Sequence, residues 1–129
     1  MLEHIVKKAK DPTENMLQKY VVYKIDCKDC SKTYVGQTKR QLETRVYEHQ
    51  KNQNQNQKYY NVISKHIKDM NSEHNINWDD VGVLHKEYNW KKRLFAEMIY
   101  IKKQGNNALN KMTDLKDYPM CYYVLVNKL

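Results

Sequence analysis

The sequence predicts a single α+β domain, in which a small antiparallel three-stranded sheet is flanked by helices. Residues 20–25 (YVVYKI) and 33–37 (TYVGQ) are β-branched or aromatic and lie on either side of a short polar bend, which is the pattern of a β-hairpin. Apolar residues recur with helical spacing in several later segments. Of the 129 residues 40% are apolar, which is enough for one modest core.

The first helix is expected directly after the hairpin. Thr38 followed by Gln41 matches a capping box, in which two side chains bond backbone N–H groups at the start of a helix. Leu42 and Val46 then form an apolar stripe. These features predict a helix over residues 39–51.

Three more elements follow from the distribution of apolar residues. Residues 59–70 have helical spacing, residues 78–87 contain a VGVL segment typical of a third strand, and residues 90–103 are again helical in spacing. Asn89 is the predicted N-cap of the last helix, and Gly105 is the residue that ends it.

The domain is expected to span residues 20–110, between an N-terminal flank at residues 1–19 and a C-terminal extension at residues 111–129 packed on the same domain. The Asn/Gln-rich residues 52–57 predict a flexible loop. Residues 118–126 (YPMCYYVLV) predict a last strand or a packed terminal segment.

The charge balance favours a nucleic-acid partner. Lys and Arg number 23 against 15 Asp and Glu, which gives a net charge of +8, and eleven Tyr and two Trp are spread among the basic residues. Such a surface suits a polyanion, although basic proteins that bind no nucleic acid are also common.

The cellular setting is inferred from what the sequence lacks. No apolar run approaches the roughly 18 residues of a membrane span, and no secretory signal is recognisable. We therefore expect an intracellular, nuclear protein without a membrane partner, whose oligomeric state the sequence leaves open. Cys27, Cys30 and Cys121 are an odd number of cysteines, which argues against a disulfide framework and leaves reduced thiols or a metal site.

Two tyrosines are candidates for phosphodiester chemistry. Hydrolysis of a phosphodiester requires a water nucleophile, a group that takes its proton, and cations or donors that stabilise the phosphoryl oxygens. Tyr23 and Tyr34 lie on the two neighbouring strands of the predicted hairpin. Ordinary cross-strand aromatic packing is the alternative interpretation of this pair.

The first predicted helix contributes a cation and an imidazole. Arg45 and His49 are four residues apart and share a helix face with Leu42. An arginine there can present a planar fork to a phosphate. The alternative is a surface ion pair of Arg45 with Glu48 or Asp80.

Glu97 is the carboxylate with the clearest pattern. It lies between Leu94 and Ile101 at helical spacing, so it faces the packed side of its helix. A carboxylate in that position needs a partner, and one divalent ion meets the requirement. A salt bridge to Arg93 is the alternative, and the two interpretations are compatible.

These features together resemble the core of a GIY-YIG endonuclease. Val-Val-Tyr at residues 21–23 and Tyr-Val-Gly at residues 34–36 stand in the places of the two tripeptides, and the helix with Arg45 and His49 follows them. The resemblance implies the GIY-YIG nuclease fold for the domain. Valine replaces the family's first glycine at Val21 and its isoleucines at two further positions, and none of these changes removes a reactive group.

The resemblance also implies a role for each candidate. Tyr23 would be the general base, and Tyr34 would position water or phosphate. Arg45 would stabilise the phosphate, His49 would support the geometry, and Glu97 would hold a catalytic Mg²⁺ or Mn²⁺. The candidates for supporting or DNA-binding roles are Gly36, Lys32 and Asn110.

A second metal site is predicted inside the hairpin. Cys27-x-x-Cys30 is the knuckle half of a tetrahedral zinc site, and His66 and His74 follow on the next predicted helix and at its end. His85 is a competing ligand. The alternative is a pair of reduced structural cysteines with two solvent histidines. This Cys-Cys-His-His order resembles the GIY-YIG domain of Penelope-like retroelements, in which paired cysteines lie between the two tripeptides.

The leading expectation is therefore a divalent-metal-dependent DNA endonuclease with a structural Zn²⁺ ion. The later residues 78–107, with a W-D strand and an N-W-x-K-R-L helix start, add to the retroelement resemblance. That resemblance implies nicking of target DNA, and a reverse transcriptase domain as a partner in the same full-length polypeptide. The alternatives are a zinc-stabilised nucleic-acid-binding module without cleavage, and a repair or restriction nuclease of the same fold.

Overall fold

A computed structural model gives the fold, and it describes residues 14–52, 62–71 and 73–110. Most of the expected N-terminal flank, most of the Asn/Gln-rich loop and the whole C-terminal extension lie outside the described residues. The third cysteine, Cys121, lies outside them as well. Within the described part of the chain, no helix is long and apolar enough to cross a membrane.

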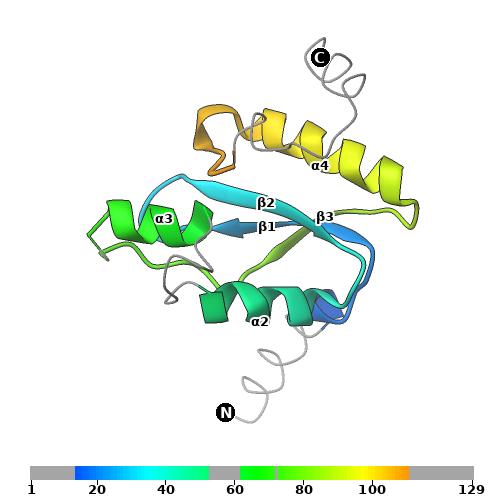
Figure 1. The fold of residues 1–129 in the computed structure, drawn as a ribbon, viewed down its shortest axis with the longest axis horizontal. Coiled ribbons are helices and arrows are strands. Elements are labelled where there is room, and N and C mark those ends of the chain that lie inside the picture. Colours follow the sequence, from blue (N-terminus) through cyan, green and yellow to red (C-terminus); the bar gives the residue numbers. More distant parts are fainter. Residues whose placement is uncertain (1–13, 53–61, 72, 111–129) are drawn as a thin grey trace.

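The centre of the molecule is a three-stranded antiparallel sheet (Figure 1). Its strands are β1 (Val21–Asp26), β2 (Thr33–Thr38) and β3 (Gly82–Lys86), in the order β2-β1-β3. In the β1–β2 hairpin Tyr23 pairs with Gly36, and in the β1–β3 pair the register shifts between Val22 and Tyr23. The predicted hairpin and the three-stranded antiparallel sheet are thereby confirmed.

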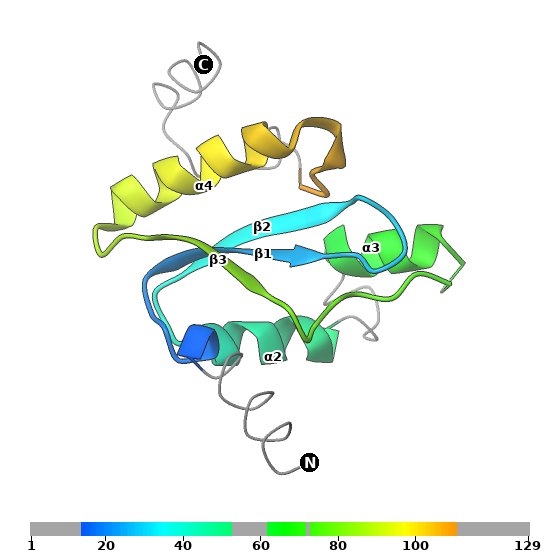
Figure 2. The ribbon, with the colours of Figure 1, turned by 180° about the vertical axis from the view of Figure 1, so that it is seen from behind.

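Helices cover both faces of this sheet. They are α2 (Leu42–Asn52), α3 (Val62–Asp69) and α4 (Trp90–Gln104), which is followed by the short 3₁₀ helix η2 (Gly105–Asn107). Figures 1 and 2 show α4 on one side of the sheet and α2 on the other, with α3 beside the hairpin end. Each face of the sheet therefore has its own apolar contacts.

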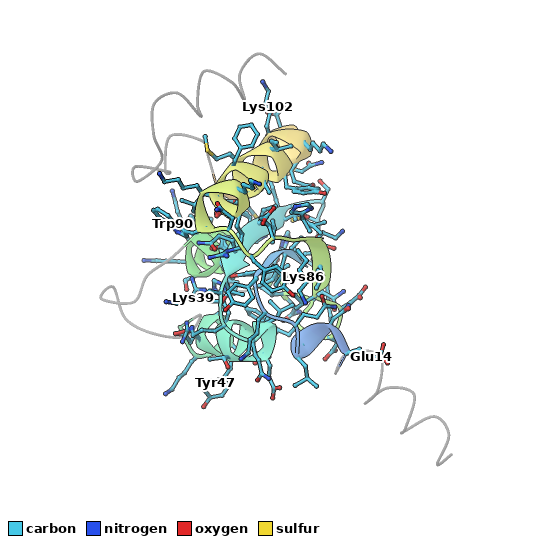
Figure 3. The ribbon with its side chains drawn as sticks, turned by 90° about the vertical axis from the view of Figure 1, so that its right-hand side faces the viewer. Glu14, Lys39, Tyr47, Lys86, Trp90 and Lys102 are labelled. Carbon is cyan, nitrogen blue, oxygen red and sulfur yellow. The ribbon has the colours of Figure 1, made fainter. Side chains whose placement is uncertain are left out.

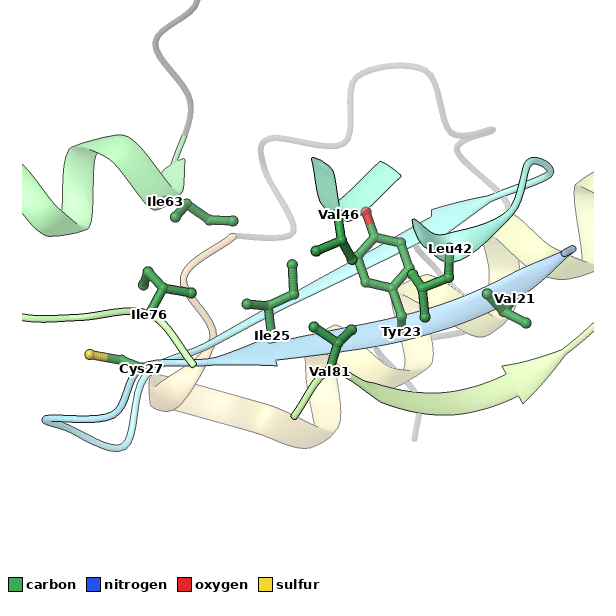
Figure 4. Close-up of a cluster of buried hydrophobic side chains, with 9 residues drawn as sticks. All are labelled: Val21, Tyr23, Ile25, Cys27, Leu42, Val46, Ile63, Ile76 and Val81. Carbon is green, nitrogen blue, oxygen red and sulfur yellow. The ribbon is translucent and has the colours of Figure 1, made fainter. Parts of the chain in front are cut away.

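The alternation of β1 explains the two layers of the core. Val21, Tyr23 and Ile25 point to the α2 side, where they pack with Leu42. The rest of this cluster, drawn in Figure 4, comes from the end of β1, from α2 and α3, and from the loop before β3. Val22 points to the opposite side and packs in a second cluster. That cluster consists of Val22, Val35, Ala96 and Ile101. A strand buried on both faces needs apolar residues at successive positions, as this one has.

The first helix starts later than predicted. α2 begins at Leu42 and not at Lys39, and Thr38 does not cap it. Instead, the hydroxyl oxygen of Thr38 accepts a hydrogen bond from the backbone N–H of Arg40 at 3.1 Å, which closes a local turn after β2. The backbone N–H of Leu42 donates to the carbonyl of Gln18 at 2.9 Å, so the chain enters the helix from a tertiary contact that the spacing could not reveal.

The other predicted element boundaries lie closer to those in the structure. The third strand is shorter than residues 78–87, because residues 78 and 79 form a turn before β3 starts at Gly82. The helix predicted over residues 59–70 is present as α3, and residues 59–61 lie outside the described part. Asn89 caps α4 by accepting from the Lys92 N–H at 3.0 Å, and Gly105, with φ of 58°, ends it.

Candidate active site

Tyr23 lies at the centre of the candidate site. Its side chain is buried against α2, and its hydroxyl oxygen is 2.9 Å from Nε2 of His49. The ring crosses directly over Gly36, because a Cβ atom at that position would lie 2.6 Å from the Tyr23 hydroxyl oxygen. Glycine is therefore required at position 36 by a side chain of the protein itself, where the sequence suggested only a close approach of some kind.

Tyr34 completes a cluster of three rings. The ring centroids of Tyr23 and Tyr34 are 6.3 Å apart, and Tyr34 meets His49 edge-on at 5.0 Å. Tyr23 and His49 are also edge-to-face, at 6.1 Å. Edge-to-face contacts of this kind stabilise a fixed ring orientation. The two tyrosines predicted from separate strands and the histidine predicted from α2 thus meet in one place.

The ionisation of this cluster is governed by burial and by Arg45. Burial, followed by the charge of the neighbouring Tyr34 phenol, raises the pKa of Tyr23 well above its usual value, while the Arg45 guanidinium acts in the opposite direction. Burial also raises the pKa of Tyr34, again opposed by Arg45. Both phenols are therefore protonated at neutral pH in the absence of a further cation.

His49 is neutral in the same setting. Burial, and then the positive charge of Arg45, lower the pKa of His49 to about 3. Its Nδ1 atom is buried without a hydrogen-bond partner among the described residues. A neutral imidazole has one acceptor nitrogen, so Nε2 can accept the Tyr23 hydroxyl proton when Nδ1 carries the ring hydrogen.

Arg45 reaches the site from α2 and keeps its charge. Burial alone would lower the pKa of Arg45, but the phenols of Tyr23 and Tyr34 and the carboxylate of Glu48 together raise it. The Arg45 Nη1 to Glu48 Oε1 distance is 3.8 Å, and the same Glu48 oxygen pairs with Arg40. The ion pair considered as an alternative role for Arg45 is present beside its contact with the phenols, so the two interpretations coexist.

Glu97 approaches from the opposite helix. It is buried on α4, with 8% of its surface exposed, and its negative charge raises the pKa of both Tyr23 and Tyr34. α4 packs mainly on β2, an edge strand of the sheet. From there the Glu97 carboxylate influences the pKa of phenols whose side chains lie on the other face of the sheet. Electrostatic interactions thus connect all five predicted catalytic residues.

The remaining candidates hold the chain after α4 against β2. The Asn110 side chain donates to the Val35 carbonyl at 2.7 Å and accepts from the Val35 N–H at 3.4 Å. The Lys32 ammonium group donates to the carbonyl of Asn106 at 2.6 Å. These contacts support the position of β2, and a role of Lys32 or Asn110 in binding DNA stays a prediction.

The four predicted zinc ligands also come together. One ligand atom from each of Cys27, Cys30, His66 and His74 lies within 4.8 Å of the others. Cys27 Sγ is 3.5 Å from His74 Nδ1, and Cys30 Sγ is 3.4 Å from His66 Nε2. Two thiols and two imidazoles at these distances match the donor set of a tetrahedral structural zinc site. His85, the competing candidate, is exposed on β3 and is not part of this group.

Two backbone segments fix this cluster. The loop before β3 pairs with the hairpin turn through a bridge between Cys27 and Ile76. The Asp29 carboxylate accepts from the Asn75 N–H at 2.7 Å, and the Lys28 N–H donates to the Asn75 carbonyl at 2.8 Å. Burial raises the pKa of the Cys27 thiol, while backbone hydrogen bonds from Asp29 and Cys30 act in the opposite direction.

Sequence reasoning missed one buried charged residue near the site. The sequence suggests Arg93 only as a partner of Glu97, but its Nε donates to Gln37 at 2.6 Å and its Nη1 donates to the carbonyls of Glu87 and Tyr88. It therefore ties β2 to the turn before α4. The arginine in the N-W-x-K-R-L segment was the available signal, but spacing alone does not show which carbonyls a guanidinium will reach.

Comparison with known proteins agrees with the geometry. The family model of the GIY-YIG catalytic domain matches residues 19–109 of the chain. No curated protein and no solved structure is significantly similar to this chain. The matched region contains β1, β2 and all five residues of the candidate site. The chain therefore belongs to the GIY-YIG family of catalytic domains and is a nuclease, a phosphodiester hydrolase.

Proposed function

We propose that this protein is a divalent-metal-dependent DNA endonuclease that nicks its target, of the type found in Penelope-like retroelements. The observation that carries the catalytic part is the hydrogen-bonded pair of Tyr23 and His49, which is buried beside Arg45 and lies within the electrostatic influence of the Glu97 carboxylate. Core packing alone does not require a cation, two phenols, an imidazole and a carboxylate in one place. Phosphodiester hydrolysis requires groups of all these kinds.

The proton of the attacking water would leave through Tyr23. The Tyr23 hydroxyl oxygen accepts it as the phenol passes its own proton to Nε2 of His49, which lies 2.9 Å away. His49 is unprotonated in the free protein, because burial and the charge of Arg45 hold its pKa at about 3. The negative charge of a bound phosphate would have to neutralise Arg45 and raise that pKa before Nε2 takes the proton. This transfer would deliver hydroxide to the phosphorus while the leaving oxygen departs on the opposite side.

Glu97 would hold the divalent ion, and Arg45 would bind a phosphoryl oxygen. When bound, Mg²⁺ or Mn²⁺ supplies positive charge that stabilises the phosphoryl oxygens and opposes the raised pKa of the neighbouring phenols. A buried carboxylate suits this role, because a bound cation would offset the free-energy cost of burying its negative charge. Arg45 keeps its charge in the site and can provide two parallel donors to the phosphate.

The decisive experiment compares nicking of supercoiled plasmid by the wild-type protein and by Glu97→Gln, with Mg²⁺, Mn²⁺ or EDTA. We expect relaxation of the plasmid that depends on the metal and is at least hundredfold slower in the variant. Glu14→Gln is a matched control, because Glu14 is an exposed carboxylate away from the site (Figure 3). A Glu97→Gln protein that nicks as fast as the wild type would refute the role of Glu97. Plasmid that is bound but never cut would favour a binding module.

We also propose that the Cys-Cys-His-His group holds structural Zn²⁺. The support is the donor set itself, since four protein ligands complete a tetrahedral ion and leave no position for water. The group lies at the hairpin turn, between β1 and β2, which is where the retroelement resemblance places the paired cysteines. The same position supports a retroelement origin over a repair or restriction nuclease.

A further inference from the structure

Two large aromatic side chains are exposed next to each other at the turn between β3 and α4. Tyr88 is 67% exposed and Trp90 is 56% exposed. Three cations accompany them, because Lys86, Lys91 and Lys92 are exposed at the same turn. We call these five residues the Trp90 corner. Exposed aromatic rings surrounded by cations are a recurrent feature of surfaces that bind unpaired nucleotides.

The backbone under the Trp90 corner is held firmly. Arg93 Nη1 donates to the carbonyls of Glu87 and Tyr88 at 3.2 and 3.4 Å. The Asn89 side chain accepts from the Lys92 N–H at 3.0 Å, and the Asn89 N–H donates to the Glu87 carboxylate at 3.0 Å. A ligand that stacks on these rings therefore does not have to order the turn first, which favours binding.

The Trp90 corner continues into a basic cleft. The ring of Tyr88 lies 5.0 Å from the ring of Tyr20, and Lys86 Nζ lies 5.5 Å from the Tyr88 ring centroid. Tyr20 in turn lines a cleft of about 520 Å³. The other residues that line this cleft are Lys19, Lys39, Arg40, Gln41 and Thr44. Figure 3 shows Trp90, Lys39 and Lys86 at this end of the molecule.

Charge complementarity points to an anionic partner. Lys19, Lys39, Lys86, Lys91 and Lys92 are all exposed here. The nearby carboxylates are engaged, since Glu87 accepts from the Asn89 N–H and Glu48 pairs with Arg40. Cations attract any nucleic acid, but flat aromatic rings add to the binding affinity only where they can stack on accessible faces of the bases. A single strand offers those faces, whereas the bases of a duplex are stacked on one another.

The Trp90 corner and the active site are connected along α4. Trp90, Arg93 and Glu97 lie on one stripe of the helix, at intervals of three and four residues. Seven residues of helix correspond to about 10.5 Å. That is roughly three nucleotide steps for a strand that keeps the 3.4 Å stacked spacing of a duplex, and fewer for a more extended strand. On the cleft side, Arg40 shares the Glu48 carboxylate with Arg45 of the active site.

We propose that the Trp90 corner is a stacking site for single-stranded DNA, which it holds a few nucleotides from the phosphodiester that is cut. The natural substrate is then DNA with an unpaired segment beside the cleavage position. The contribution to cleavage rests on the proposed endonuclease function, whereas the binding of a single strand does not depend on it.

Binding can be measured without cleavage, in EDTA, by the fluorescence anisotropy of a labelled twelve-nucleotide oligo(dT). We expect Trp90→Ala to weaken the affinity roughly five- to hundredfold, the range found when a ring that stacks on a base is removed. The matched control is Tyr47→Ala, because Tyr47 is 60% exposed and has Lys51 Nζ 5.8 Å from its ring, but lies on α2 away from the Trp90 corner (Figure 3). Affinity in the control should equal that of the wild type.

A duplex of the same length tests the specificity for unpaired bases. Trp90→Ala should change the affinity for the duplex less than twofold. Unchanged oligo(dT) binding in Trp90→Ala, an equal loss with Tyr47→Ala, or an equal loss with the duplex would each overturn the proposal. A protein that never nicks plasmid but loses oligo(dT) binding with Trp90→Ala would refute the proposed function alone. Because Trp90 is mostly exposed, thermal unfolding of the variant should match that of the wild type.

Discussion

The Tyr23 hydroxyl oxygen lies 2.9 Å from Nε2 of His49, and both side chains are buried. Tyr23→Phe should therefore affect both catalysis and stability. Removal of the hydroxyl group leaves the His49 nitrogen buried without a partner, which costs about 1–3 kcal/mol of unfolding free energy. Loss of the proton acceptor should slow nicking by about 10²- to 10⁴-fold. Urea unfolding and plasmid nicking measure the two effects, and nicking at the parental rate would exclude Tyr23 as the base.

Gly36→Ala should be more damaging than Gly82→Ala. A Cβ at position 36 would lie 2.6 Å from the Tyr23 hydroxyl oxygen and 2.7 Å from the adjacent ring carbon, so a buried ring must move. A Cβ at position 82 would meet only the Lys24 side chain, at 3.2 Å. We expect Gly36→Ala to lose about 1–3 kcal/mol of stability, together with most of the nicking activity. Equal unfolding midpoints for the two variants would contradict the close packing of Tyr23 on Gly36.

The stability of the domain should depend on pH through His49. Its pKa is about 3 in the folded protein against an ordinary value of 6.5. Between those values the unfolded chain binds more protons than the folded one, so stability rises with pH. The contribution is complete above about pH 6.5 and is lost as the pH falls toward 3, with a slope of at most about 1.4 kcal/mol per pH unit.

His49→Gln separates this contribution from those of other titrating groups. Glutamine does not titrate, so the variant should lack the part of the slope that His49 causes. Urea unfolding of both proteins at several pH values between 4 and 7 provides the comparison. Parallel curves would mean that His49 is protonated in the folded protein as readily as in the unfolded chain.

Removal of zinc should unfold the hairpin end of the domain. We expect about one equivalent of zinc in the purified protein and its loss in Cys27→Ser. The unfolding temperature should fall by roughly 10 °C or more, because a structural zinc ion contributes several kcal/mol to folding. His85→Asn is the control, since His85 is exposed on β3 outside the ligand group. A zinc-free protein with the same unfolding temperature as the zinc-loaded one would disprove a structural role.

Much of this organisation was predictable, because local patterns specified it. The two runs of β-branched and aromatic residues predicted β1 and β2, and Asn89 and Gly105 predicted the ends of α4. The spacing of Arg45 and His49 placed both on one face of α2. The four-ligand cluster was predicted from an isolated Cys-x-x-Cys and two distant histidines, which only the family resemblance connected.

Other features depend on contacts that no local pattern contains. The start of α2 at Leu42 follows from a hydrogen bond to Gln18, outside the helix and before the sheet. The requirement for Gly36 follows from the position of a tyrosine ring on the neighbouring strand. The burial of Arg93 follows from three acceptors, one on β2 and two in the turn before α4. In each case the partner was visible in the sequence, but its distance in space was not.

The pairing of Asn110 with Val35 also has a consequence for self-association. β2 is an edge strand, and unpaired edges invite other chains to add strands and aggregate. Here the amide of Asn110 occupies both backbone hydrogen-bonding groups of Val35, and a parallel bridge between Thr33 and Ala108 occupies the start of the strand. The Asn110 side chain thus makes the two hydrogen bonds that a neighbouring strand would otherwise make with Val35. A second copy would have to break these bonds before it could pair with the first half of β2.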